Sequence, residues 1–160
     1  MRKFIILFLV LCITDYPLIY ACEKPAITKD LDSRALQLVK YLIDNSQKIS
    51  PSTQPYSDSG IKDLVYLGGA VLDKITSSQK KYGDNLNVNL VDISRDIHFN
   101  RNEKVECVFD RQLGKEVFFG VTHVIVISYK NNELFGLRLR YDKDRNKFHI
   151  IGYWTLTGTI

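Results

Sequence analysis

Apolar residues recur at helical spacing in two segments of the first half of the chain. The first segment covers residues 31–45, where the apolar positions are Leu31, Ala35, Leu38, Val39 and Leu42. Thr28 or Asp30 can cap its start by accepting hydrogen bonds from free backbone amides. The second segment runs from Ser59, a candidate cap, to Gly83, and a Gly-Gly pair interrupts its apolar stripe. We predict one helix in each segment.

The pattern changes beyond Gly83, where β-branched and aromatic residues dominate and the spacing is typical of strands. The predicted strands are LNVNL (86–90), KVECVFD (104–110), EVFFGVTHVIVISY (116–129), ELFGLRLRY (133–141) and KFHIIGYW (147–154). RQLGK, KNN and DKDRN separate the later strands and are credible turns. The order predicts an α+β domain over residues 31–160, with two N-terminal helices packed on a curved antiparallel β-meander of about four strands.

This order of elements, ending in KFHIIGYW, resembles the nuclear transport factor 2-like, or cystatin-like, superfamily. The resemblance covers residues 31–156 and is one of pattern. It implies a cone-shaped cavity between helices and sheet, which such proteins use for binding, for dimerisation or for catalysis. Fold alone does not decide among those uses.

The N-terminus has the layout of a secretory signal peptide over residues 1–21. Arg2 and Lys3 precede the apolar run at 4–13, and Ala21 is the small residue before the expected cut. The run is shorter than the about 20 residues that a membrane-spanning helix needs. We therefore expect an exported protein, periplasmic or extracellular, with a short N-terminal arm at 22–30. No transmembrane helix is expected.

Two cysteines, Cys22 and Cys107, are left once the leader is removed. In an oxidising compartment the simplest arrangement is one disulfide between them. The first alternative is a lipid anchor on Cys22, because LIYAC resembles a lipobox, although Tyr20 stands where that pattern has a small residue. The second alternative is a pair of free thiols.

Antiparallel register predicts a row of polar side chains across three strands. If Asn131 and Asn132 form a two-residue turn, His123 pairs with Arg140. A turn within DKDRN pairs Asp142 with Lys147 and Arg140 with His149. The neighbouring row is Ile125, Arg138 and Ile151, while Val124, Val126, Phe135, Leu137, Leu139 and Ile150 form a core on the other face.

The predicted binding residues are therefore His123, Arg138, Arg140 and His149. Two imidazoles beside a guanidinium can hold an anion, and the alternative is an ordinary wet sheet face. No acidic residue falls in the row, so no catalytic residue is predicted. Asp142-x-Asp144-x-Asn146 resembles the start of a calcium loop but lacks its Gly and its Glu, so no metal or cofactor is expected.

The net charge of the chain limits which classes of partner are expected. The formal charge of +4 falls to +3 without the leader's two basic residues and one acidic residue, which is too small to indicate a nucleic-acid partner. The expected function is an exported, non-catalytic binding or adaptor protein for a protein or small ligand, including an inhibitor or immunity-type protein. The alternative functions are an enzyme with a site in the helix–sheet cavity and a structural component of an envelope assembly. A second copy of the chain, forming a homodimer, is a further candidate partner.

Overall fold

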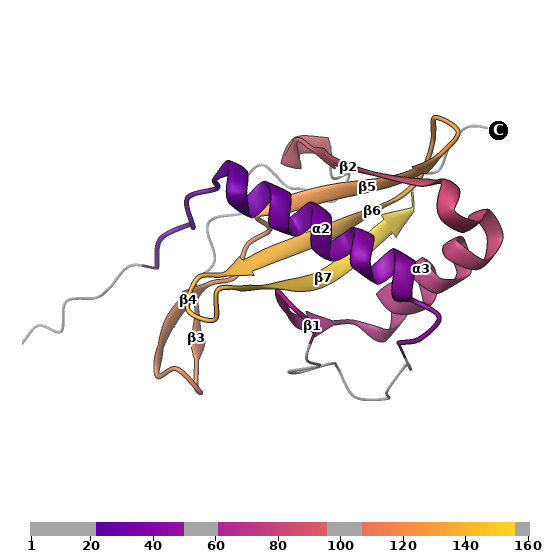
Figure 1. The fold of residues 1–160 in the computed structure, drawn as a ribbon. Helices are drawn as coiled ribbons and strands as arrows, with labels where there is room; N and C mark the ends of the chain where they lie inside the picture. The colour runs from indigo at the N-terminus through magenta and orange to yellow at the C-terminus, as the bar shows by residue number, and fades with distance from the viewer. Residues whose placement is uncertain (1–21, 50–60, 96–106, 156–160) are drawn as a thin grey trace, which may run out of the picture.

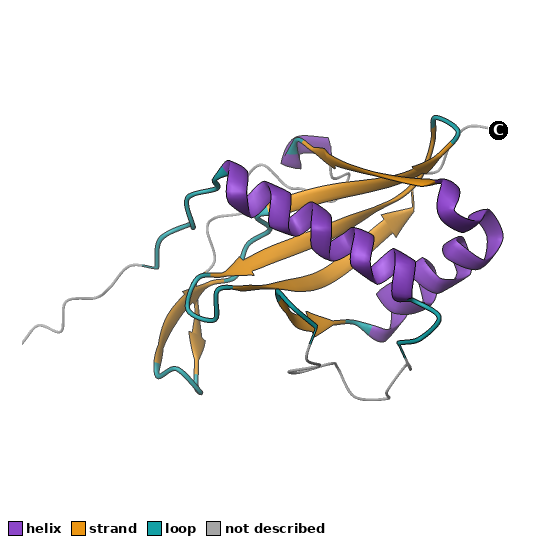
Figure 2. Ribbon diagram, viewed as in Figure 1, coloured by secondary structure: helices purple, strands orange, loops and turns teal. Residues whose placement is uncertain are grey.

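The structure is a computed structural model that describes residues 22–49, 61–95 and 107–155 (Figure 1). It contains two α-helices, a five-stranded sheet and a separate two-stranded sheet (Figure 2). In chain order the elements are α2 (Lys29–Asn45), β1 (Leu64–Leu67), α3 (Gly69–Tyr82), β2 (Leu86–Val91), β3 (Cys107–Asp110), β4 (Lys115–Phe118), β5 (His123–Tyr129), β6 (Asn132–Asp142) and β7 (Lys147–Thr155), with 3₁₀ turns at Gly83–Asn85 and Ile93–Arg95. The prediction of an α+β fold is confirmed. The predicted signal peptide lies outside the described residues.

Helix α2 forms where the apolar spacing predicted it. Thr28 is the cap, and its hydroxyl oxygen accepts a hydrogen bond from the Leu31 amide at 3.3 Å. The stripe Leu31, Ala35, Leu38, Val39, Leu42 and Ile43 is buried. Figure 1 shows α2 lying across one face of the five-stranded sheet, so this stripe packs on the strands beneath it.

The second predicted helix is wrong in its first third. Residues 64–67 form strand β1, which pairs in parallel with β7, and α3 begins only at Gly69. Gly68 is the helix cap in an extended conformation, so the glycines start the helix rather than interrupt it. A short apolar run such as LVYL does not distinguish strand from helix by spacing alone. The predicted cap at Ser59 lies outside the described residues.

The five-stranded sheet has the order β1-β7-β6-β5-β2, and all pairs except β1–β7 are antiparallel. The β5–β6 turn is built on Lys130 and Asn131, both with positive φ, one residue earlier than predicted. This displacement moves each partner by two positions and keeps the face of every side chain. A bulge between Ile127 and Ser128 then moves each partner back by one position, so the net displacement is one residue and the predicted faces no longer match.

The bulge overturns the predicted pairing of His123. His123 lies opposite Leu139 rather than Arg140, and its side chain faces the helices. Ile125 is likewise in the helix-covered core, whereas Val124 and Val126 lie on the other face. In the β6–β7 hairpin the predicted pairs Asp142–Lys147 and Arg140–His149 are present, but a second bulge pairs Arg138 with Gly152 instead of Ile151.

Apolar side chains fill the space between helices and sheet. The buried residues from β5, β6 and β7 in this core are Ile125, Ile127, Phe135, Leu137, Leu139, Phe148 and Ile150. On the opposite face the indole of Trp154 lies against Gly136, where a β-carbon would stand 2.1 Å from its ring. Thus the helix–sheet space is a packed core, and the larger cleft of the described structure lies elsewhere.

Strands β3 and β4 form a hairpin that projects from one end of the sheet (Figure 1). The long strand predicted over 116–129 breaks at residues 119–122, where the Phe118 ring covers Gly120. A disulfide joins Cys107 of this hairpin to Cys22, with the α-carbons 5.8 Å apart, as predicted. Cys107 lies in the separate two-stranded sheet and not in the five-stranded one.

Candidate functional site

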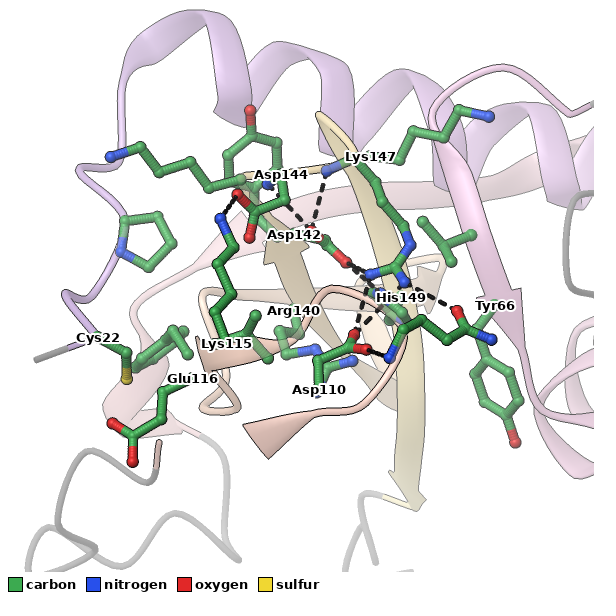
Figure 3. Close-up of a pocket in the computed structure, with 18 of the residues that line it drawn as sticks. Cys22, Tyr66, Asp110, Lys115, Glu116, Arg140, Asp142, Asp144, Lys147 and His149 are labelled. Carbon is green, nitrogen blue, oxygen red and sulfur yellow. Dashed lines mark hydrogen bonds and ion pairs between the residues drawn. The ribbon is translucent and has the colours of Figure 1, made fainter. Parts of the chain in front are cut away.

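A cleft lies between the β3–β4 hairpin and the turn that joins β6 to β7 (Figure 3). Its volume is about 1100 Å³. The N-terminal arm at Cys22, Glu23 and Pro25 closes one side, and β1 contributes residues 64–66. Four parts of the chain that are distant in sequence therefore meet around one cavity, as ligand sites commonly require.

Aspartate side chains shape both turns that border the cleft. The Asp110 carboxylate accepts hydrogen bonds from the amides of Gln112 and Leu113, at 2.8 and 3.2 Å, and so folds the β3–β4 turn. Asp142 does the same in the β6–β7 turn, accepting from the amides of Asp144 and Arg145. DKDRN is therefore a turn, as predicted from the sequence.

Ion pairs connect the two turns across the cleft. The guanidinium of Arg145 lies between two carboxylates, with Nη1 2.7 Å from Asp142 Oδ2 and 3.4 Å from Asp110 Oδ2. Lys115 on β4 pairs with Asp144 on the other turn. These contacts, together with the disulfide, hold the hairpin as one wall of the cleft.

Asp142 of β6 and His149 of β7 form a hydrogen-bonded pair on the opposite side of the cleft. His149 Nε2 lies 3.1 Å from Asp142 Oδ2, and the two side chains are only 12% and 9% exposed. Burial alone would raise the pKa of Asp142, but hydrogen bonds from His149 and from the backbone and side chain of Arg145 outweigh it. The pKa of Asp142 is therefore well below its ordinary value, and this side chain is an anion at neutral pH.

Arg140 is a half-buried cation of the cleft that makes no hydrogen bond or close ion pair with the other described residues. Its Nη1 is buried without a hydrogen bond, and its guanidinium lies over the Phe119 ring, 4.3 Å from the ring centroid. Burial lowers the pKa of Arg140 below its ordinary value, and the charges of Asp142 and Arg145 act in opposite directions. A half-buried guanidinium without a hydrogen bond is an unsatisfied group.

Three of the four predicted binding residues share one face of the sheet. Arg138 and Arg140 are two positions apart on β6, and His149 is the partner of Arg140 on β7. Arg140 and His149 line the cleft; Arg138 does not, and lies over the ring of Trp154 at 5.6 Å. The predicted row therefore reduces to Arg140 and His149 at the cleft.

His123, the fourth predicted binding residue, is buried under α2. Its Nδ1 lies 2.8 Å from Thr122 Oγ1, and its Nε2 lies 3.5 Å from Asp32 Oδ1. Burial lowers the pKa of His123 more than Asp32 raises it, so the imidazole is neutral at pH 7. It belongs to the core, not to the cleft.

Sequence reasoning missed the acidic half of the site. It expected no carboxylate beside the histidines, but Asp142 is the diagonal neighbour of His149 across the hairpin. The signal was present in the predicted pair of Asp142 with Lys147, because a diagonal contact follows from that register. The contribution of Asp110 and Arg145 could not be found, because it depends on where the hairpin packs.

The composition of the cleft limits its chemistry. Among the described residues that line it there is no serine or threonine, and Cys22 is in the disulfide. In the described ranges no group of three or more His, Cys, Asp or Glu side chains is arranged to hold a metal ion. Nor does any helix there have the length and apolar character to cross a membrane.

In comparisons with known proteins, no protein-family model, no curated protein and no solved structure matches the chain.

Proposed function

We propose that the protein is an exported, non-catalytic binding protein that holds an anionic group of its ligand against Arg140 in the cleft. The observation that carries this proposal is the half-buried guanidinium of Arg140, which has a stacking contact but no hydrogen bond. Arginine offers a fork of donors that suits a carboxylate or phosphate. An anion bound there would supply the missing partner.

The ion pairs of two other basic groups in the cleft lining support Arg140 as the ligand-binding cation, whereas Lys143, which also lines the cleft, is exposed to solvent. Arg145 is held by Asp142 and Asp110, and Lys115 is held by Asp144. An incoming anion would have to compete with these carboxylates. At Arg140 no side chain has to be displaced from a hydrogen bond.

Export and the fold family are part of the same proposal. The leader pattern supports secretion, and the disulfide supports an oxidising compartment. The Cys22 sulfur that bonds Cys107 cannot also carry a thioether-linked lipid, which favours a protein without an anchor at this residue. A long α2 lying across a mostly antiparallel sheet supports the cystatin-like relationship.

The test is the effect of acetate on thermal unfolding at constant ionic strength. A ligand at ten times its Kd stabilises the folded state by about 1.4 kcal/mol, or a few degrees in Tm. We expect acetate in place of chloride to raise the Tm of the wild type and of Arg111→Met, an exposed cation outside the cleft lining. Arg140→Met should lose the shift. Equal shifts in Arg140→Met and Arg111→Met would contradict the proposal.

A second readout separates binding from stability. Because Arg140 makes no hydrogen bond, its replacement by methionine removes an unsatisfied charge and keeps the apolar stem. We expect Arg140→Met to be at least as stable as the wild type without acetate. A loss above about 2 kcal/mol, as for a broken buried ion pair, would mean that Arg140 has a structural role.

The second candidate is an enzyme, favoured by the His149–Asp142 pair. An imidazole oriented by a carboxylate is the arrangement of a general base, and here water would be the nucleophile. The test is hydrolysis of 4-nitrophenyl acetate by the wild type and by His149→Asn. A rate above buffer that His149→Asn abolishes supports catalysis; a wild-type rate equal to buffer counts against it.

A further inference from the structure

An apolar wall borders the cleft beside Arg140. Val117 and Phe118 of β4 and Val65 of β1 are half-buried and line the cavity, so each keeps apolar surface exposed inside it. Pro25 of the N-terminal arm also lines the cavity. Half-exposed aliphatic and aromatic side chains in a concave site are the usual contacts of a ligand's apolar part.

The position of this wall is fixed by close packing and by covalent attachment. The Phe118 ring lies so close to Gly120 that a β-carbon there would be 2.4 Å from Cζ. The disulfide at Cys107, the residue opposite Phe118, ties the same hairpin to the arm. The wall is therefore held in place and presents a preformed surface.

Positive and negative side chains line different parts of the cleft. Arg140 provides a half-buried cation, while Glu23 and Glu116 line the cavity and make no ion pair or hydrogen bond with the other described residues. Figure 3 shows Glu116 beside Cys22, away from Arg140. A ligand with an anionic group at each end would bring one of them toward these glutamates and be repelled. One anionic end and an uncharged remainder suit the cleft better.

We propose that the ligand is an amphiphilic monocarboxylate, whose carboxylate pairs with Arg140 and whose apolar body lies along Val117, Phe118 and Val65. This rests on the proposed function and names its ligand class. A cavity of about 1100 Å³ is at the upper end of the range for small-molecule sites, so it holds far more than an inorganic anion. An alkanoate and a short peptide with an apolar C-terminal residue share this chemistry.

The proposed apolar contact predicts how binding affinity changes with the length of the ligand's alkyl chain. Each methylene group buried against the wall should tighten binding roughly fourfold, the ratio that follows from the transfer free energy of one CH₂. The probes are acetate, butanoate, hexanoate and octanoate, titrated at constant ionic strength and followed by backbone amide shifts. We expect Kd to fall by about this factor per methylene until the chain extends beyond the wall. Octanedioate should bind more weakly than octanoate.

Two variants locate the apolar contact. Val117→Thr replaces a methyl group by a hydroxyl at nearly constant shape and should reduce the gain in affinity per methylene group. Val108→Thr is the matched control, since Val108 lies opposite Val117 in the hairpin and does not line the cleft. Comparing N-acetylleucine with N-acetylglycine tests whether the ligand is a peptide with an apolar C-terminal residue. The series in which Kd falls more per added carbon, the alkanoates or the N-acetyl amino acids, identifies which of the two ligands the cleft binds.

The outcomes separate the two proposals. If acetate binds in an Arg140-dependent way but longer chains bind no better, the ligand class is wrong and the anion site stands. An equal loss of chain-length dependence in Val117→Thr and Val108→Thr would also overturn the ligand class. If no member of the series binds in an Arg140-dependent way, the proposed function fails first.

Discussion

Gly136 provides the sharpest test of how the second face of the sheet is packed. It lies within β6 beneath the ring of Trp154, which is only 3% exposed. A β-carbon at Gly136 would stand 2.1 Å from Cζ2 and 2.2 Å from Cη2 of that ring. Real contacts are never so short, so Gly136→Ala must displace the indole from its site.

The expected cost follows from overpacking. Forcing one extra methyl group into a packed site typically costs about 1–3 kcal/mol. Gly152 on β7 is the matched control, because its nearest neighbour would be Arg138 Nη1 at 3.9 Å. Gly152→Ala should gain about 0.5 kcal/mol by lowering the entropy of the unfolded chain. The two changes in unfolding free energy should thus have opposite signs and differ by about 1.5–3.5 kcal/mol.

Urea unfolding followed by circular dichroism measures both free energies. Trp154 is the single tryptophan, so its emission gives a second readout, and we expect a red shift in Gly136→Ala alone. If Gly136→Ala proves as stable as Gly152→Ala and its emission is unchanged, the indole does not lie on β6 as described.

Three further predictions concern the disulfide, a buried histidine and the ion pair between Arg34 and Asp63. Replacing Cys22 and Cys107 by serine should lower the unfolding free energy by about 4–5 kcal/mol, the chain-entropy value for an 85-residue separation, and a change below 1 kcal/mol would refute it. Burial lowers the pKa of His123 in the folded protein, so just below pH 6.5 the imidazole takes up a proton in the unfolded chain only. The free energy of unfolding should therefore fall as the pH drops below 6.5, and it should fall less steeply in His123→Gln. Arg34 Nε donates to Asp63 Oδ1 at 3.1 Å, and Arg34→Met should cost about 1–3 kcal/mol in urea unfolding, whereas no loss would show that the pair is not formed.

The elements that could be predicted from sequence are those with long, unambiguous patterns. The apolar stripe of α2, its Thr28 cap and the β6–β7 turn all follow from local residues. The first part of the second helix could not be predicted, because β1 becomes a strand by pairing with β7, which is distant in sequence. The break of the long strand at 119–122 depends on a similar contact between Phe118 and Gly120.

The candidate site shows how a shift of one residue in strand register limits prediction from sequence. Arg140 and His149 were placed correctly, because the β6–β7 turn has the expected length and the bulge in that hairpin lies beyond them. His123 was misplaced by the single extra residue of the bulge after Ile127, which no local pattern reveals. The carboxylates of Asp110 and Asp142 reach the site through turns that sequence reasoning treated as connections only.

The most direct test of the central claim is a titration of the arginine side-chain Nε–Hε signals with acetate. The account predicts that the Arg140 signal shifts in a saturable way and the Arg111 signal does not. If the Arg140 signal does not move, or if both signals drift together with salt, the cleft does not bind an anion at Arg140.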